Sequence, residues 1–238
     1  MKRYITIDNQ DNILNAEKRE MVLLKANPCC HWRHCKFCDY YLDNFGLKPD
    51  EIISFNKEVL SNVSGKFGVL EVINSGSVFE LPSSTINEIM NLTIKKNINT
   101  IYFESFPVYI KKIPTLKSLF LENGITLRFR VGLETFNEEF RVNVLGKKIY
   151  NSLIHDIEEV YYSTCLIVGI EGQSKKDIIN DIDEGLAHFK KITINVFCKN
   201  TTKIGIDYPL ISWFKEYAVQ KLKGNYRIEI FLDNNILQ

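Results

Sequence analysis

Short apolar runs alternate along the chain with longer segments that repeat apolar residues at helical spacing, from about residue 20 to the C-terminus. The runs are rich in Val, Ile, Leu and Phe, which is typical of strands covered on both faces of a parallel sheet. They predict strands at 21–26, 68–74, 100–104, 126–134, 164–170, 192–197 and 227–232. The intervening segments predict helices at 50–62, 84–96, 107–121, 137–145, 151–160, 174–190 and 208–222.

The repeated strand–helix order predicts an α/β fold in which outer helices cover a parallel sheet. The units are fewer than the eight of a full barrel, so we expect a partial (β/α)6 TIM-like barrel. No Pro/Gly/Ser-rich linker interrupts the pattern, which favours one domain over 1–238, with a core at about 20–200 and a C-terminal β/α extension at 201–238. The active site of such a fold lies at the carboxyl ends of the strands.

Composition narrows the range of partners. Lys and Arg number 30 against 29 Asp and Glu, so no global field attracts nucleic acid or an anionic membrane. No run of about 18 apolar residues is present, and residues 1–15 lack the apolar core of a signal peptide. We expect a cytoplasmic protein that binds a small molecule and has no direct nucleic-acid or membrane partner.

Four of the six cysteines fall within residues 29–38, directly after the first predicted strand. Such a cluster in a reducing compartment favours metal binding or redox chemistry over disulfides. Cys165 and Cys198 stand alone in apolar runs, and we interpret them as ordinary small buried residues.

Two kinds of metal site fit the loop. A structural zinc site would use Cys30, Cys35 and Cys38 with His31 or His34, and ligand spacing alone does not exclude it. An iron-sulfur cluster is favoured because a domain of this size needs no metal to hold its fold together. Three thiolates can also leave the fourth iron of a 4Fe-4S cluster open to a non-protein ligand.

The same loop resembles that of the radical S-adenosylmethionine superfamily, which carries a C-x-x-x-C-x-aromatic-C sequence after the first strand of a partial barrel. The run from Cys35 to Cys38 matches its second half, with Phe37 at the aromatic position whose backbone meets the adenine. The first half departs from the pattern, so the third ligand is Cys30 with one extra residue, or Cys29 with two. We expect Cys30, because a small residue usually precedes the ligand. The resemblance implies a 4Fe-4S cluster and S-adenosyl-L-methionine as cofactors.

Further motifs of the superfamily follow in order. Ser75, Gly76 and Ser77 resemble the turn that receives the amino group of the cofactor's methionine, and a glycine there allows close backbone approach. Arg128, Arg130 and Glu134 share one face of a strand. That face suits a cofactor carboxylate, with Arg130 nearest the rim, although an internal salt-bridge network is the alternative.

The segment from Arg130 to Thr135 resembles the fourth strand of the Elongator-subunit and methylthiotransferase branch, which adds Glu134 to the expected cofactor contacts. Glu104 also matches that branch, which adds it to the expected cofactor contacts. The run from Leu166 to Ser174 resembles its fifth-strand motif, which implies that backbone near Val168 and Ile170 frames the adenine.

The short chain and its cysteine run look most like the queuine lyases of this superfamily. That similarity implies a radical lyase that cleaves queuine in queuosine salvage and releases 7-aminomethyl-7-deazaguanine, with electrons from a donor such as flavodoxin or ferredoxin. The alternatives are a radical enzyme for another small molecule and a zinc-stapled, non-catalytic binding protein. Trp32, Tyr40 and Tyr41 could stack on a flat substrate, although such aromatics more often pack.

A deazaguanine needs a carboxylate to accept its paired N–H donors. Rim position makes Asp39, Glu104 and Asn200 candidates for substrate contacts, and no residue is identified as catalytic.

Overall fold

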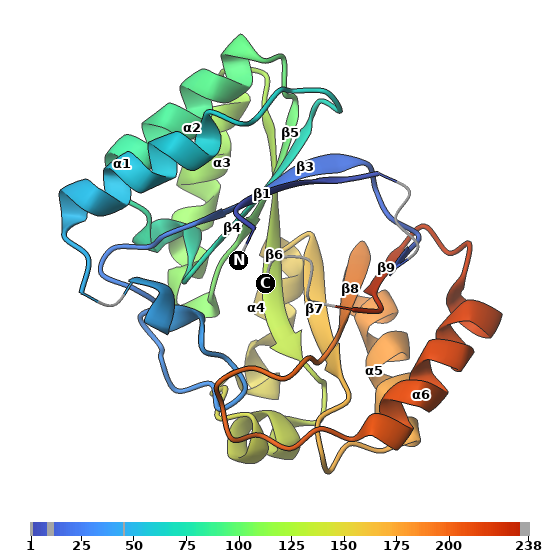
Figure 1. Ribbon diagram of the computed structural model, residues 1–238. Coiled ribbons are helices and arrows are strands. Elements are labelled where there is room, and N and C mark those ends of the chain that lie inside the picture. Colours follow the sequence, from blue (N-terminus) through green and yellow to red (C-terminus); the bar gives the residue numbers. More distant parts are fainter. Residues whose placement is uncertain (1, 9–11, 45, 234–238) are drawn as a thin grey trace.

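The computed structural model describes residues 2–8, 12–44 and 46–233. In them one nine-stranded sheet, in the order β1-β3-β4-β5-β6-β7-β8-β9-β2, curls into a half-barrel (Figure 1). Neighbours from β3 to β9 are parallel, and each edge carries one antiparallel strand. The strands are β1 (Tyr4–Ile7), β2 (Ile13–Leu14), β3 (Arg19–Leu24), β4 (Val69–Asn74), β5 (Thr100–Glu104), β6 (Thr126–Glu134), β7 (Ser163–Val168), β8 (Lys191–Val196) and β9 (Ile228–Phe231).

Helices cover the outer face of this sheet (Figure 1). They are α1 (Pro49–Leu60), α2 (Ser83–Lys95), α3 (Ile113–Leu121), α4 (Ile154–Val160), α5 (Lys175–His188) and α6 (Tyr208–Tyr217). Helix α5 shows why they form where the pattern predicts. Ser174 and Asp177 close a capping box at its start, and Ile178 and Ile182 face the sheet. Not one helix in the described ranges is long and apolar enough to cross a membrane.

Side chains along each strand point alternately to the core beneath the helices and to the interior of the half-barrel. On β4, Leu70 and Val72 belong to the large apolar core beneath the helices, whereas Glu71 and Ile73 point into the half-barrel. The outer face thus stabilises the fold, and the inner face is left to polar side chains.

Buried ion pairs fill the half-barrel below its carboxyl-end rim. The Arg19 guanidinium bonds the carboxylates of Glu71 and Glu229, and Arg130 lies 2.5 Å from Glu71. Glu17 accepts hydrogen bonds from Lys191 and Tyr102 at 2.8 Å each, which ties the segment between β2 and β3 across the amino ends of the strands. This segment therefore crosses the amino end of the half-barrel.

The predicted α/β half-barrel is confirmed, and β5 and β6 have the predicted ends. The sequence missed β1 and β2, which are too short to show a pattern. The segment predicted as one helix at 107–121 is a 3-10 turn followed by α3, because Pro114 lacks the N–H that a continuous helix would use. The segment 151–160 is likewise a 3-10 turn followed by α4. The segment 208–222 is helical throughout, as predicted, with α6 continued by a π-helical turn to Leu222. The segment 137–145 is helical at 138–144, with a π-helical turn at Phe140–Val144.

Candidate active site

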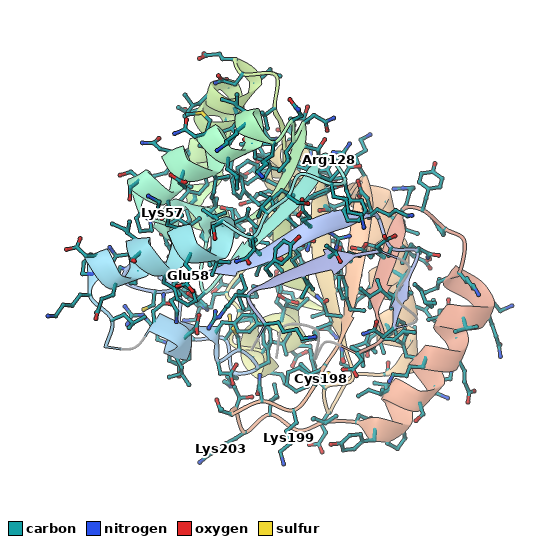
Figure 2. All side chains as sticks on the ribbon, turned by 45° about the horizontal axis from the view of Figure 1, so that its top comes forward. Lys57, Glu58, Arg128, Cys198, Lys199 and Lys203 are labelled. Carbon is teal, nitrogen blue, oxygen red and sulfur yellow. The ribbon has the colours of Figure 1, made fainter. Side chains whose placement is uncertain are left out.

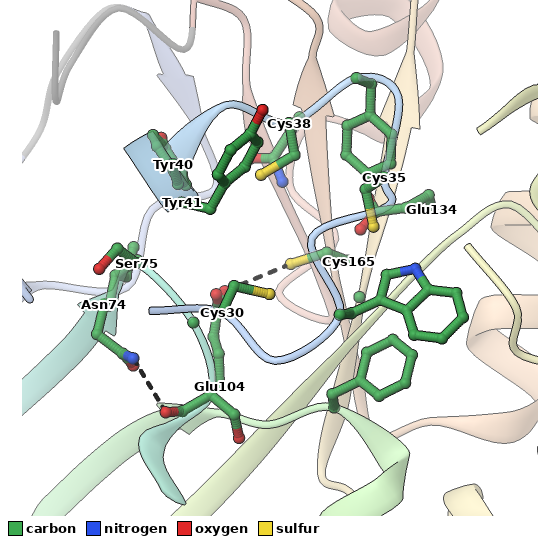
Figure 3. A pocket seen from close by; sticks show the side chains of 18 of the residues that line it. Cys30, Cys35, Cys38, Tyr40, Tyr41, Asn74, Ser75, Glu104, Glu134 and Cys165 are labelled. Atoms are coloured by element: carbon green, nitrogen blue, oxygen red, sulfur yellow. Dashed lines mark hydrogen bonds between the residues drawn. The ribbon is translucent and has the colours of Figure 1, made fainter. Parts of the chain in front are cut away.

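A cavity of about 280 Å³ lies inside the half-barrel at the carboxyl ends of the strands (Figure 3). Residues 30–41 form one wall, and we call residues 29–39 the cysteine loop. The turn 73–77, the segment 104–106 and the loop 197–200 complete the rim. The segments that follow β3, β4, β5 and β8 therefore meet at this cavity, whereas the turn at 169–172 does not line it.

Three thiols of the cysteine loop face this cavity. Cys30, Cys35 and Cys38 line it, and Cys29 does not (Figure 3). Burial raises the pKa of the Cys35 thiol to about 11 and that of Cys38 to about 12. Both therefore carry a proton at neutral pH unless a bound cation favours the thiolate, as binding to a metal does.

The cysteine loop is fixed by residues 145–147, which follow the π-helical turn after β6 and which we call the turn after β6. Trp32 Nε1 donates to the carbonyl oxygen of Gly146 at 3.0 Å, and Lys36 N donates to that of Leu145 at 2.8 Å. Gly146 has φ +70°, and a Cβ there would collide with the carbonyl oxygen of His34. Position 146 therefore requires glycine for two reasons, the left-handed backbone conformation and the closeness of the His34 carbonyl oxygen.

The donor set fits a cluster of several irons. Thiolates are the ligands that iron-sulfur clusters take, and each corner of a cubane takes one. Among the described residues, no three His, Cys, Asp or Glu side chains converge on a single ion. Cys30, Cys35 and Cys38 instead border one cavity from separate points of the loop (Figure 3).

The turn after β4 packs tightly against the cysteine loop. Ser75, Gly76 and Ser77 all line the cavity. A Cβ at Gly76 would collide with the Glu80 carboxylate and lie 3.1 Å from the Cα of Cys30. The turn and the cysteine loop can approach this closely only because residue 76 has no side chain.

Asn74 presents an unpaired acceptor beside this turn. It lines the cavity and is 3% exposed. Its Nδ2 donates to the carbonyl oxygen of Ser77 at 3.0 Å, whereas its Oδ1 has no partner within the described part of the chain. Leaving such an atom without a donor costs about 1–3 kcal/mol. The ammonium group of an amino-acid cofactor would supply one, so this side of the cavity fits S-adenosylmethionine.

Glu134 and Lys147 form an ion pair on the wall of the cavity opposite Asn74 and Ser75. Their Oε1 and Nζ atoms lie 2.6 Å apart, both residues line the cavity, and the Lys147 ammonium lies 5.8 Å from the centre of the Phe37 ring. The Glu134 carboxylate and the nearby thiols hold the pKa of Lys147 above its usual range despite burial. Lys147 was not predicted, since a lysine in a turn carries no signal of burial.

The floor of the cavity joins the buried ion pairs. Arg130 lines it, as predicted, but its guanidinium pairs with Glu71 at 2.5 Å and with Glu104 at 3.4 Å. Arg130 therefore belongs to an internal salt-bridge network, which was the alternative to a cofactor contact, and also lines the cavity. Burial raises the pKa of Glu104, and Arg130 opposes that rise.

Arg128 lies away from this cavity although it shares a strand face with Arg130 (Figure 2). Its Nη1 atom is 2.6 Å from the Tyr102 hydroxyl and 3.5 Å from Glu17. The reason is the strand rise, which places Arg128 two residues closer to the amino end.

The candidate substrate residues Asp39, Tyr40, Tyr41 and Asn200 all line the cavity. Asp39 accepts hydrogen bonds from the backbone N–H and the hydroxyl of Thr201 at 2.9 and 2.8 Å. Asn200 Nδ2 donates to the carbonyl oxygen of Phe37 at 2.7 Å. These two polar side chains thus fasten the loop after β8 to the cysteine loop.

Val168 and Ile170 do not line the cavity. Val168 belongs to the core beneath the helices, and Ile170 packs in a smaller apolar cluster that Phe37 contacts. The backbone N–H of Ile170 donates to Gln173 Oε1 at 2.9 Å, so Gln173 holds this turn. Phe37 itself lines the cavity, as expected of the aromatic position.

The two isolated cysteines differ from each other. Cys165 is buried, as predicted, although it lines the cavity. Cys198 also lines the cavity and is only half-buried, so the interpretation of Cys198 as a buried residue was wrong. Cys165 is on the inner face of β7 with its Sγ 3.9 Å from Glu104 Oε1 (Figure 3). Cys198 follows β8, where the chain leaves the sheet for the rim.

The chain is similar to a queuine lyase from Clostridium spiroforme, whose structure was solved with SAM and queuine bound: 43% identity, 97% of this chain and 95% of that one covered, TM-score 0.86. Two structures of Streptococcus suis SuiB, one of them bound to S-adenosylmethionine, share the fold at 16% and 15% identity, each with a TM-score of 0.51. They cover 88% and 87% of this chain but only 48% and 49% of SuiB. The chain matches no protein-family model and no curated protein.

Proposed function

This chain belongs to the queuine lyase family of radical S-adenosylmethionine enzymes, and on that premise we propose that it cleaves queuine and releases 7-aminomethyl-7-deazaguanine. The observation that carries this proposal is the similarity to a queuine lyase over nearly the whole chain. The cofactors are a 4Fe-4S cluster and S-adenosylmethionine, which together supply a carbon radical that removes a hydrogen atom from the substrate.

Cys30, Cys35 and Cys38 hold the cluster in this proposal. They are the thiols of the cysteine loop that line the cavity, and Cys29 does not line it. The loop stays in place because Trp32 and Lys36 bond the turn after β6. A fixed loop would hold the cluster at the wall of the cavity that these three thiols line.

The cofactor's methionine end lies at Ser75, Gly76 and Ser77, where Asn74 Oδ1 accepts from its ammonium group. Its carboxylate and ribose lie toward Glu134 and Lys147, whose ion pair offers both an acceptor and a donor. Its adenine would lie by Phe37, which lines the cavity. Arg130 holds the carboxylates of Glu71 and Glu104 in place at the floor.

The substrate occupies the remaining space, next to Tyr40 and Tyr41. Both rings stand on the 3-10 turn Tyr40–Asn44, directly after the last cluster ligand (Figure 3). Asp39 and Asn200 contribute by closing the rim, since their hydrogen bonds join two loops. A closed rim holds a small substrate in the orientation that hydrogen removal needs.

An acidic electron donor such as flavodoxin or ferredoxin reduces the cluster. Exposed cations lie on the cysteine loop itself and on the loops that follow β6 and β8: Arg33, Lys36, Lys148, Lys199 and Lys203, the last two labelled in Figure 2. The chain as a whole is nearly neutral, so this local excess favours an acidic partner. Six cysteines without a disulfide suit a cytoplasmic location, where thiols stay reduced.

The test is anaerobic incubation of the reconstituted protein with S-adenosylmethionine, a strong reductant and queuine, followed by chromatography. We expect 7-aminomethyl-7-deazaguanine and 5'-deoxyadenosine to appear together. The Cys38→Ala variant is the control and should form neither product. Unchanged queuine beside active cofactor cleavage would refute the queuine assignment and favour another small molecule.

A further inference from the structure

The proposed function leaves open which side chain recognises the deazaguanine ring, and the inference here rests on that function. A ring with paired N–H donors calls for a carboxylate acceptor. Four carboxylates line the cavity: Asp39, Glu71, Glu104 and Glu134. Their partners within the protein distinguish them.

Three of the four already have strong partners. Glu134 is paired with Lys147 at 2.6 Å, and Asp39 holds Thr201 by two hydrogen bonds. The side chain of Glu71 is 1% exposed and lies between two guanidinium groups, those of Arg19 and Arg130. Glu71 and Glu134 cannot turn to a substrate without leaving a buried cation unpaired, and Asp39 cannot do so without releasing Thr201 and the loop after β8.

Glu104 differs in both exposure and pairing. Its side chain is 33% exposed, at the end of β5 beside Arg130 on β6. Its Oε1 has only long contacts, 3.4 Å to Arg130 and 3.9 Å to the Sγ of Cys165. Within the described ranges, nothing bonds its second oxygen, Oε2. Figure 3 shows Glu104 on the cavity wall with Cys165 beside it.

The surroundings of Glu104 suit a flat ring. Met21 and Phe231 give the cavity apolar walls, and Tyr40 lies within electrostatic reach of the Glu104 carboxylate. We propose that Glu104 accepts the N1–H and 2-amino hydrogens of the deazaguanine in a two-point contact, and so sets the specificity of the enzyme for this ring. Arg130 holds the carboxylate in place from the side.

A substrate analogue tests this contact. Removing the 2-amino group of queuine takes away one hydrogen bond to a charged acceptor, and should lower kcat/KM of the unmodified enzyme about 10- to 100-fold. Glu104→Gln keeps the shape of the side chain but turns a donor toward the ring, and should lower kcat/KM for queuine about 100-fold or more. The two changes should not add, because each removes the same contact.

Iron content and the visible absorbance spectrum serve as the internal control. In Glu104→Gln both should equal those of the unmodified enzyme, which shows that the variant is folded and loaded. A KM for S-adenosylmethionine raised as much as the KM for queuine would place Glu104 at the cofactor and overturn the inference. Unaltered kcat/KM for queuine would overturn it too. An unmodified enzyme that leaves queuine intact would remove the proposed function itself.

Discussion

At the scale of single residues, the account depends on which thiols bind iron. Cys30, Cys35 and Cys38 line the cavity, and Cys29 does not. We predict that Cys30→Ala lowers the iron content of the reconstituted protein to background, whereas Cys29→Ala retains it. Iron and sulfide assays with the visible absorbance spectrum measure this. If Cys29→Ala loses the cluster and Cys30→Ala keeps it, our choice of ligand is wrong.

Asp181 gives a pH-dependent prediction far from the cluster. Burial raises the pKa of this carboxyl from 3.8 to about 6, against hydrogen bonds from Phe136 N–H and the Thr135 hydroxyl. The unfolded chain releases this proton at lower pH than the folded protein, so stability falls as pH rises from about 4 to 6. At neutral pH the loss is about 3 kcal/mol.

The Asp181→Asn variant lacks this titration. Its free energy of unfolding, relative to the unmodified protein, should therefore increase from pH 4 to pH 7. Urea denaturation at several pH values measures the difference. A difference that stays constant with pH would contradict the raised pKa of Asp181.

At the scale of elements, the sequence located most strands and helices because each has its own signal. The Ser174–Asp177 capping box marks the start of α5, and the apolar run at 126–134 is β6 from end to end. What it could not locate depends on contacts between distant segments. β1 and β2 are strands only because β3 and β9 offer free edges, and Lys147 is buried only because Glu134 faces it.

The capping box itself gives a prediction. Ser174→Ala removes the side-chain acceptor for the Asp177 N–H and should destabilise the protein by about 1 kcal/mol. Ser118→Ala, at an exposed position inside α3, is the matched control and should leave stability unchanged or slightly raised. Chemical denaturation of both variants decides. Equal midpoints would show that the cap contributes nothing.

At the scale of the whole molecule, the residues that stabilise the half-barrel and those that form the candidate site lie at different heights along its axis. Toward the amino ends of the strands, the guanidinium of Arg19 bonds the carboxylates of Glu71 and Glu229, and all three side chains are almost fully buried. The carboxyl ends carry the cavity. The sequence placed the candidate site correctly at the carboxyl ends, but showed neither this charge network nor the partners of Asp39 and Asn200, which depend on how the loops pack.

Arg19→Met tests the network. It leaves two buried carboxylates without their shared cation and should destabilise the protein by about 3–5 kcal/mol. The exposed pair of Lys66 and Asp8 is the control, and Lys66→Met should leave the denaturation midpoint unchanged. An Arg19→Met protein as stable as this control would show that the network contributes no stability.

The most direct test of the central claim, that one cavity brings the radical and queuine together, is isotope transfer. Queuine is deuterated at the carbon-bound positions of its cyclopentenediol and incubated with the reduced, reconstituted protein and unlabelled S-adenosylmethionine. Mass spectrometry should find deuterium in the 5'-deoxyadenosine that accompanies 7-aminomethyl-7-deazaguanine. Unlabelled 5'-deoxyadenosine together with intact queuine would contradict the account.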